Sequence, residues 1–144
     1  MDILLHLVGG WTGGKSLVES SPKDLEFMLN QHIWTSFHLA QAFTPLLTAN
    51  QWGRVIVVSS PLASQPPANM GPYSIGKAAQ EALIRTLAAE SKGSGVTANI
   101  IQVRMIDVEG KGKGTTPQQI VTAMLYLCSD EAGQVNGARI PLYS

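Results

Sequence analysis

The sequence predicts an α/β fold, with a parallel sheet of about four strands and flanking helices. Short apolar runs rich in Val, Ile and Leu are typical of buried strands, and longer stretches with helical patterning separate them. Strands that alternate with helices pair in parallel, because each helix carries the chain back along the sheet. The expected strands cover residues 2–8, 54–59, 96–103 and 137–142, and the expected helices cover 22–48, 73–92 and 117–129.

Two of the expected helices begin with clear start signals. Ser21 can cap the helix at 22–48, and Pro22 suits its first turn because a proline lacks only an N–H that would be unpaired there. Thr116 followed by Pro117 gives the last helix the same kind of start. These signals fix the amino ends of the helices better than hydrophobic patterning alone does.

Length and composition indicate one domain over residues 1–144. A chain of this size buries roughly 68% of its unfolded surface, which is enough for a single core. Ten acidic and ten basic residues give no electrostatic footprint for nucleic acid or for an anionic membrane. The single cysteine, Cys128, excludes an intrachain disulfide. Because we see no signal peptide and no long apolar span, we expect a cytoplasmic protein, and we identify no metal ligands.

The strongest chemical signal lies after the second expected strand. That strand, 54–59, brings Ser60 to its carboxyl end, where ligands bind in open α/β sheets. Tyr73 and Lys77 follow at the start of the next helix, four residues apart and therefore on one face. A cation about 4 Å away would stabilise tyrosinate by about 4 kcal/mol at an effective dielectric of about 20, which offsets the gap between a tyrosine pKa and neutral pH. We predict an acid/base site, although this spacing also occurs in ordinary helices.

Several segments match the motifs of one known family in order along the chain. VIVVSS and YSIGK, at 55–60 and 73–77, resemble its catalytic strand, serine and YxxxK helix. ANIIQV, at 98–103, resembles the next strand, and 115–142 resembles the closing helix and last strand. DILLHLVGG corresponds to the strand that ends in the family's Asn-Asn-Ala-Gly turn, with Gly9 at the glycine position. On these residues the chain resembles the short-chain dehydrogenase/reductase family over nearly all its length, which implies a partial Rossmann-like fold.

The resemblance implies roles for individual residues. Tyr73 would be the general acid/base, Lys77 would lower the pKa of Tyr73 and hold ribose hydroxyls, and Ser60 would orient a carbonyl. The family's active-site asparagine falls on His32, which can donate, accept or relay a proton. A buried histidine without a catalytic role is an equally good interpretation. Gly9, Tyr73 and Lys77 would contact the cofactor, NADP or NAD, and the reaction would transfer hydride between it and a small carbonyl or alcohol.

We expect each crossover between neighbouring strands to be right-handed, because nearly all crossovers between parallel strands are. The family's strand order does not reverse within the part that this sequence resembles. With no reversal, right-handed crossovers place the three helices on one face of the sheet.

Part of the family's pattern has no match in this sequence. A full-length member has a Gly-rich phosphate-binding turn and further strand–helix pairs before the segment that resembles the start of this chain. We therefore expect a truncated form in which half of the cofactor site is missing, and Arg104-Met105 also replaces the family's Pro-Gly. The strand at 2–8 would then be an unpaired apolar edge. We expect the chain to form a homo-oligomer or to pair with another polypeptide.

Three other functions were weighed. Residues 9–16, GGWTGGKS, match the P-loop pattern, but a P-loop needs a helix that begins at its Lys-Ser pair, and Pro22 follows too closely for a long one. A cofactor-independent hydrolase could use Ser60 as nucleophile, with Tyr73 and Lys77 as base. A non-catalytic assembly subunit could recruit a partner through its first strand. The last two remain open from the sequence.

Overall fold

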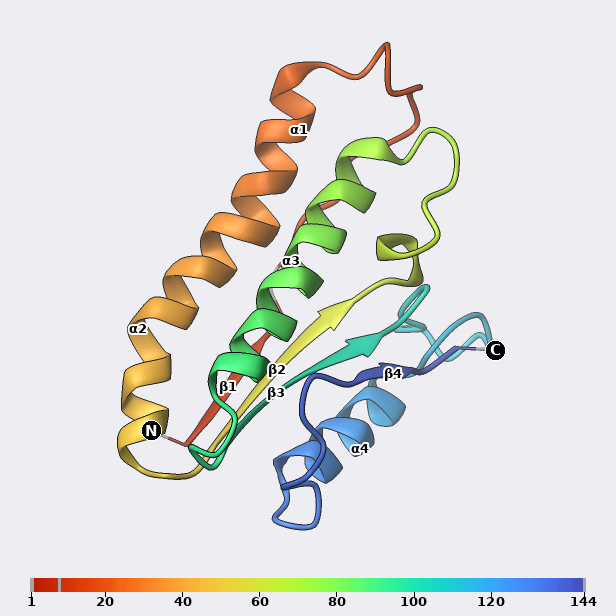
Figure 1. Ribbon diagram of the computed structural model, residues 1–144. Coiled ribbons are helices and arrows are strands. Elements are labelled where there is room, and N and C mark those ends of the chain that lie inside the picture. Colours follow the sequence, from red (N-terminus) through yellow and green to blue (C-terminus); the bar gives the residue numbers. More distant parts are fainter. Residues whose placement is uncertain (1, 8, 144) are drawn as a thin grey trace.

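The computed structural model describes residues 2–7 and 9–143. Every expected helix and strand is present (Figure 1), and the strand expected at 2–8 is described only within its residues 2–7. The elements in order are β1 (Ile3–His6), α1 (Pro22–Leu29), the π-helical η1 (Asn30–Trp34), α2 (Thr35–Ala49), β2 (Gly53–Ser59), the 3-10 turn η2 (Pro61–Ala63), α3 (Gly71–Glu90), β3 (Val96–Gln102), α4 (Pro117–Cys128) and β4 (Arg139–Pro141).

The four strands form one parallel sheet in the order β1-β2-β3-β4. Leu5 lies opposite Ile56, and Val57 lies opposite Ile100. All four strands therefore end at the same edge of the sheet. This arrangement confirms the predicted partial Rossmann-like sheet, and it brings the ends of β1 and β2 close to the start of α3.

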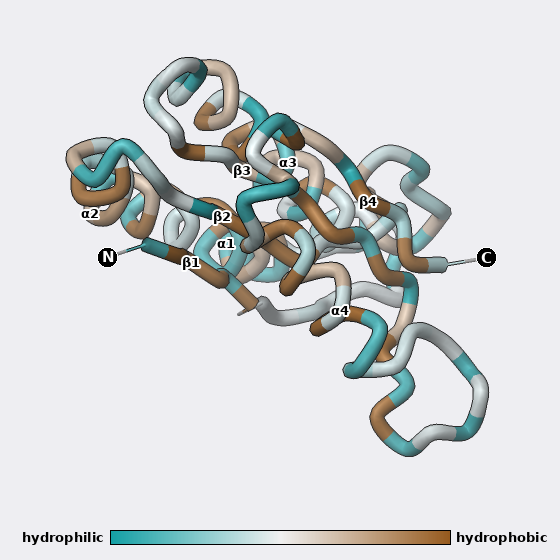
Figure 2. The backbone as a smooth tube through the Cα atoms, turned by 90° about the horizontal axis from the view of Figure 1, so that it is seen from below, coloured by the Kyte–Doolittle hydropathy of each residue, from teal (hydrophilic) through white to brown (hydrophobic). Residues whose placement is uncertain are grey.

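Each face of the sheet has its own apolar core. On one face Val55 and Val57 pack against Leu47 of α2 and Ile84 of α3. On the other face Ile56 and Ile101 pack against α4. Because successive side chains of a strand point to opposite faces, α4 lies on the other side of the sheet from α2 and α3 (Figure 2).

The position of α4 corrects the expectation that the three helices share one face. The steps from β2 to β3 and from β3 to β4 run in the same direction across the sheet, yet α3 and α4 cover opposite faces. The two crossovers therefore have opposite hands, so they cannot both be right-handed. The α3-facing side of β3 is already filled by buried Ile84 and Leu87, whereas Ile101 on its other side needs the cover that α4 provides.

The first long helix is interrupted at its middle. It starts as predicted, because the Ser21 hydroxyl accepts from the N–H of Asp24 and the Asp24 carboxylate accepts from the N–H of Ser21. Residues 30–34 then adopt a π-helix, which holds one more residue per turn than an α-helix and was not predicted. His32 lies within this π segment and is fully buried.

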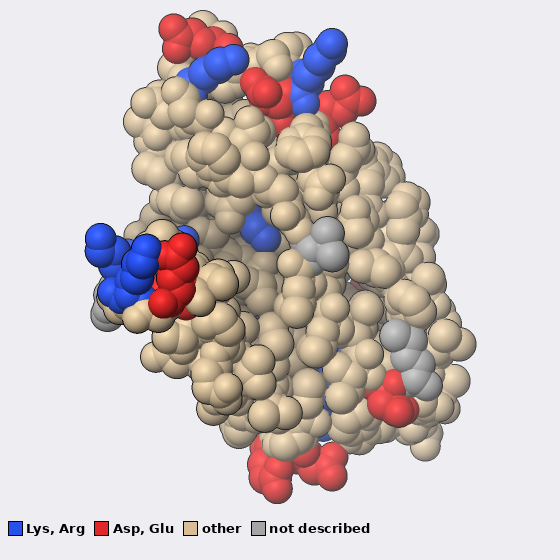
Figure 3. Space-filling model, turned by 180° about the vertical axis from the view of Figure 1, so that it is seen from behind, with Lys and Arg blue, Asp and Glu red and all other residues tan. Residues whose placement is uncertain are grey.

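The outer edge of β1 faces no other strand in the described part of the chain. Ile3 and Leu5 point to the face that α4 covers elsewhere, and they are 39% and 44% exposed. Leu7 continues this surface at 55% exposed. Charged side chains gather mainly around the rim of this side of the molecule (Figure 3). The apolar, unpaired edge that the sequence predicted is therefore present.

Candidate active site

The candidate site lies where β2 ends and α3 begins. Ser60 follows the last residue of β2 and is buried. Its hydroxyl caps η2 by accepting from the N–H of Leu62 at 3.3 Å. Tyr73 lies in the first turn of α3 and is half-buried. A hydrogen bond from the Ser60 hydroxyl acts to lower the pKa of Tyr73. The structure thus brings together the serine and the tyrosine that the sequence singled out.

Lys77 lies one turn further along α3, but its ammonium group does not contact the Tyr73 hydroxyl as expected. It donates to the carbonyl oxygen of Val58 at 2.9 Å and to Oε1 of Gln80 at 3.2 Å, and no hydrogen bond joins it to Tyr73. Burial lowers the pKa of Lys77 to about 8, and the charge of Glu81 opposes this shift. Burial also raises the pKa of Tyr73 above its ordinary value. In this arrangement desolvation raises the pKa of Tyr73, and other acceptors hold the ammonium group of Lys77; the role expected of Lys77 stays a prediction.

His32 packs directly against Tyr73. The two rings meet edge to face, with centroids 5.7 Å apart and planes at 84°. The imidazole Nε2 is 3.0 Å from the carbonyl oxygen of Gly10, and since a carbonyl only accepts, Nε2 carries the proton. The buried Nδ1 then has a free lone pair and no partner among the described residues. Burial first, and then the charge of Lys77, lower the pKa of His32 to about 4, so the ring is neutral at neutral pH.

Gly9 leaves the space that the His32 ring fills. A Cβ atom added at Gly9 would lie 2.7 Å from Cε1 of His32 and 3.7 Å from Nζ of Lys77. A Cβ atom added at Gly76 would lie 2.9 Å from Cδ2 of the same ring. The imidazole is therefore held between the loop after β1 and the first turns of α3. Gly9, His32 and Lys77, which the sequence placed on three separate elements, meet at one point.

A buried polar chain behind Lys77 was missed by the sequence analysis. Nε2 of the fully buried Gln80 donates to the hydroxyl of Ser36 at 2.9 Å. The Ser36 hydroxyl in turn donates to the backbone carbonyl of His32 at 2.6 Å. This chain ties α3 to the end of the π segment. The available signal was Gln80 three residues after Lys77 in an Ala-rich helix, a spacing that puts both side chains on one face.

Three further buried polar atoms near this site have no hydrogen-bond partner within the described residues. They are Nε2 of His6 and the hydroxyl oxygens of Ser59 and Ser74, in addition to Nδ1 of His32. Burial, followed by the charge of Lys77, lowers the pKa of His6 as well. Buried polar atoms without protein partners are typical of places that hold ordered water. The sequence analysis gave His6 no role.

The residues present fit one half of a dinucleotide site. Tyr73 and Lys77 stand at the carboxyl edge of the sheet, where the family resemblance places the nicotinamide ribose. Residues 9–16, however, lead into no helix, since the first described helix begins at Pro22. A pyrophosphate-binding helix start directly after β1 is therefore absent from the described residues, and so is the helix that a P-loop would need. Only the nicotinamide side of the cofactor has matching residues.

The described residues offer neither a membrane-spanning helix nor a metal site. None of these helices combines the length and the hydropathy that crossing a bilayer requires. No group of three or more His, Cys, Asp or Glu side chains is arranged to hold a metal ion in the part that the structure describes.

Comparisons with known proteins identify the family. Residues 1–119 match the family described as short chain dehydrogenase. The chain is 28% identical to 7alpha-hydroxysteroid dehydrogenase of Escherichia coli, over 95% of this chain and 60% of that enzyme. It is 24% identical to the 3-oxoacyl-(acyl-carrier-protein) reductase MabA of Mycobacterium tuberculosis, over 92% and 61%. A tropinone reductase homolog of Arabidopsis thaliana is 32% identical over 70% of this chain and 38% of its own length.

The chain spans about 60% of the length of the first two relatives, as those coverages show. The match reaches across all of β1, α1, α2, β2, α3 and β3, and it includes Ser60, Tyr73 and Lys77. Together with the parallel sheet and the meeting of these residues at its carboxyl edge, the match shows that this chain belongs to the short-chain dehydrogenase family.

Proposed function

We propose that this chain is the catalytic part of an NAD(P)-dependent oxidoreductase that acts on a small carbonyl or alcohol. The observation that supports this most directly is the contact of Tyr73 with both the Ser60 hydroxyl and the ring of His32 at the carboxyl edge of β2. Membership of the family supports the reaction class. The chain spans about 60% of the length of two of its relatives, so the activity of a whole protein is part of this proposal.

Tyr73 is the proton donor in this proposal. Because burial raises its pKa, its hydroxyl is protonated at neutral pH and suits a general acid that protonates a carbonyl oxygen. The Ser60 hydroxyl lies beside it and would orient the same oxygen. Together these two groups would bind the oxygen of a carbonyl substrate.

Lys77 would resupply the proton that Tyr73 gives up, and His32 would help to hold the relay in place. A pKa of about 8 lets Lys77 carry a proton at neutral pH and release it readily. The free Nδ1 of His32 and the ammonium of Lys77 both lie within 4 Å of one point beside Gly9. An ordered water in contact with both groups would accept from Lys77 and donate to Nδ1 of His32, in place of the asparagine that the resemblance leads one to expect.

The cofactor, NADPH or NADH, would supply the hydride. Tyr73, Lys77 and the backbone at Gly9 would hold its nicotinamide ribose. Its pyrophosphate has no matching residues in the described chain, so we propose that a second copy or another polypeptide completes the site by covering the free edge of β1. That edge lies beside the same carboxyl ends that carry Tyr73.

The site geometry gives less support to a cofactor-independent hydrolase. Such an enzyme needs Tyr73 as a base that takes the proton of Ser60, which requires a lowered pKa. Burial instead raises the pKa of Tyr73. Turnover of an activated ester that is lost in both Ser60→Ala and Tyr73→Phe would reverse this preference.

A calorimetric titration tests the proposal. NADPH and then NADH would be added to the chain at a low and at a high protein concentration, with sedimentation velocity run on the same samples. We expect binding that strengthens as the chain assembles and that Lys77→Ala weakens. Absence of binding in fully assembled samples would contradict self-completion of the site. Cofactor binding that Lys77→Ala and Tyr73→Phe together leave unchanged would contradict the assigned site.

A further inference from the structure

A buried carboxylate lies one helical turn beyond Lys77. Tyr73, Lys77 and Glu81 follow one another at intervals of four residues, so α3 presents all three on one side of the helix. Glu81 is fully buried, and each of its two carboxylate oxygens accepts a hydrogen bond. Buried charges are unfavourable unless they are paired and hydrogen-bonded, so both the partners and the neighbours of Glu81 matter.

Two side chains from the sheet hold the Glu81 carboxylate. Nε2 of Gln102, at the end of β3, donates to Oε1 at 2.8 Å, and Nε of Arg139 on β4 donates to Oε2 at 2.6 Å. Gln102 is itself buried, whereas the side chain of Arg139 is 41% exposed. Solvent therefore screens the guanidinium more than the carboxylate, and the ion pair does not cancel the negative potential of Glu81 inside the protein.

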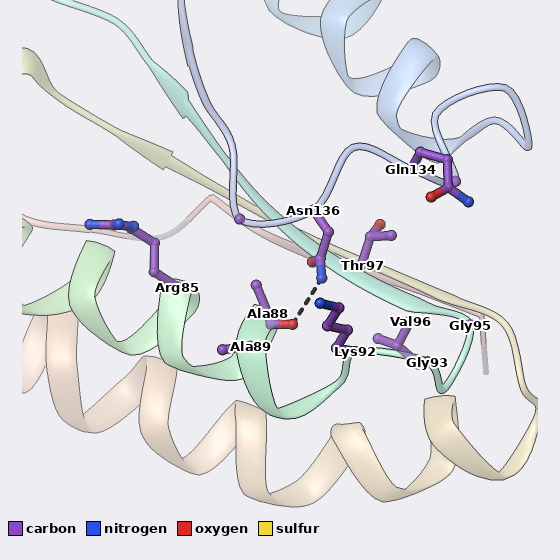
Figure 4. Close-up of a pocket in the computed structure, with 12 residues that line it drawn as sticks. Arg85, Ala88, Ala89, Lys92, Gly93, Gly95, Val96, Thr97, Gln134 and Asn136 are labelled. Atoms are coloured by element: carbon purple, nitrogen blue, oxygen red, sulfur yellow. Dashed lines mark hydrogen bonds between the residues drawn. The ribbon is translucent and has the colours of Figure 1, made fainter.

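The strand β4 is fixed against α3 by a second contact. Nδ2 of Asn136 donates to the carbonyl oxygen of Ala88, in the last turns of α3, at 2.8 Å (Figure 4). Oδ1 of the same side chain accepts from the N–H of Ala98 on β3 at 2.9 Å. Arg139 follows three residues later, at the start of β4. The guanidinium therefore reaches Glu81 from a strand that is held to α3 independently of the ion pair.

The ammonium group of Lys77 has neutral hydrogen-bond partners. It donates to the carbonyl oxygen of Val58 and to Oε1 of Gln80, and neither group carries a charge. These dipoles orient the ammonium, but they do not balance its charge. Because Lys77 is only 7% exposed, solvent offsets little of that charge either. A balancing charge has to come from the protein itself.

The other titratable groups that face Lys77 from the described elements carry no negative charge at neutral pH. His6 on β1 and His32 in the π segment have lowered pKa values, because burial and the charge of Lys77 disfavour their protonated forms. Burial raises the pKa of Tyr73, so its hydroxyl stays protonated. Glu81 supplies the negative charge, and this charge raises the pKa of Lys77 against the larger effect of burial.

We propose that Glu81 is a positioning residue that keeps Lys77 in its ammonium form, with Gln102 and Arg139 fixing the carboxylate. Side chains four residues apart on a helix lie about 5–6 Å apart, a distance at which opposite charges shielded from water attract strongly. The catalytic consequence rests on the proposed function, because only there does Lys77 return a proton to Tyr73. The charge state of Lys77 does not depend on that reaction.

Nuclear magnetic resonance of the full chain with carbon-13-labelled lysine measures the pKa of Lys77 without cofactor or turnover. The remaining lysines are exposed, and Lys77→Arg identifies the signal of Lys77. Glu81→Gln keeps the shape and an acceptor for Gln102 but removes the negative charge, so the pKa of Lys77 should fall from about 8 by about one unit. Glu90→Gln, at an exposed position later on α3, should leave it unchanged.

Removing the cation of the ion pair should have the opposite sign. Arg139→Gln leaves the carboxylate of Glu81 less neutralised, so the pKa of Lys77 should rise, by less than about one unit because solvent already screens the guanidinium. Arg139→Lys, which keeps the charge, should leave the value near that of the parent chain. A disturbance of packing alone gives no reason for shifts in opposite directions.

Three results would overturn the assignment. These are an unchanged pKa of Lys77 in Glu81→Gln, shifts in the same direction in Glu81→Gln and Arg139→Gln, or an equal shift in Glu90→Gln. A melting curve for each variant reports folding. If Glu81→Gln does not fold, the double change of Glu81→Gln with Arg139→Met removes both charges and leaves neither unpaired. The pKa of Lys77 should still fall in the double variant, and an unchanged value there would also contradict the proposal.

Turnover separates this inference from the proposed function. In the assembled protein the alkaline limb of the pH–rate profile should move with the pKa of Lys77, and it should therefore fall at lower pH in Glu81→Gln. A shifted pKa with an unmoved limb would count against the role of Lys77 in the proposed reaction and would leave the assignment of Glu81 intact.

Discussion

The carboxyl edge of the sheet, at the start of α3, and the free edge of β1 are built in opposite ways. At the start of α3, polar side chains are buried, held by hydrogen bonds and separated by glycines that touch the His32 ring. Along β1, apolar side chains are open to solvent and the backbone edge is free. Internal contacts therefore fix Tyr73, Lys77 and His32, the groups that would move protons. The apolar surface of β1 next to them stays exposed to solvent. In the proposed function, catalytic geometry and cofactor binding therefore belong to separate parts of the molecule.

We expect the largest effect on activity from removing the hydroxyl of Tyr73, the proposed proton donor at the start of α3. Tyr73→Phe removes one hydroxyl and should reduce carbonyl reduction by about a hundredfold to ten-thousandfold, the usual worth of a positioned proton donor. The ring contact with His32 remains, so the thermal melting point should hardly change. Turnover would be followed by NADPH absorbance with the assembled protein. Tyr126→Phe on the exposed face of α4 is the matched control, and equal loss in both variants would sink the assignment.

The next effect comes from the neutral, buried state of His32. Its pKa falls from 6.5 in the unfolded chain to about 4 in the folded one, so the unfolded state binds more protons between these values. The stabilisation is therefore complete above the unfolded pKa and is lost as the pH falls toward 4, by about 3 kcal/mol at most. His6 acts in the same direction.

Urea unfolding at several pH values measures this loss. His32→Asn should flatten the curve between pH 6.5 and 4, and His38→Asn at an exposed position should not. A curve that keeps its full slope without His32 would show that the ring is not the titrating group.

A smaller effect on stability tests how tightly Gly9 packs against the His32 ring. Gly9→Ala forces a Cβ atom against the His32 ring at 2.7 Å, and such overpacking costs about 1–3 kcal/mol. Adding His32→Asn, a smaller side chain, should restore part of the lost stability, so the two changes should not be additive. Denaturant midpoints of the two single variants and the double variant give the coupling. Simple additivity would mean that Gly9 and His32 do not press on one another.

Leu5→Lys should have the smallest effect on stability. It is also the most direct test of whether the chain associates through the unpaired edge of β1. Because Leu5 is 44% exposed, the free energy of unfolding of the chain should change by less than about 0.5 kcal/mol. Association through β1 should nevertheless weaken strongly, since a charge must then be buried at the contact. Light scattering across a concentration series reads this out, with Val18→Lys in an exposed loop as control. Identical association in both variants would place the contact elsewhere.

Much of this architecture could be predicted because its signals are local. The caps at Ser21 and Thr116 and the apolar runs of β2 and β3 depend on neighbours within a few residues, and all are found where expected. The face on which α4 packs could not be predicted from a rule about crossovers, because it depends on which side of β3 is already covered.

The candidate site divides in the same way. Spacing along the chain predicted that Ser60 and Tyr73 would meet. It could not predict that Lys77 would bind the carbonyl oxygen of Val58, because that partner comes from β2. The balance between burial and nearby charge that sets the pKa of Tyr73 is likewise a property of the folded surroundings.

The number of residues in the π segment at 30–34 determines whether His32 faces Tyr73. One residue of helix corresponds to about 100° of rotation, so the extra residue in this turn sets the angle at which α1 meets α2. Deleting a single residue there would favour a continuous α-helix, and it would rotate α1 relative to α2 about the helix axis. This rotation would carry the His32 ring away from Tyr73, although the side chain of Tyr73 itself would be unchanged.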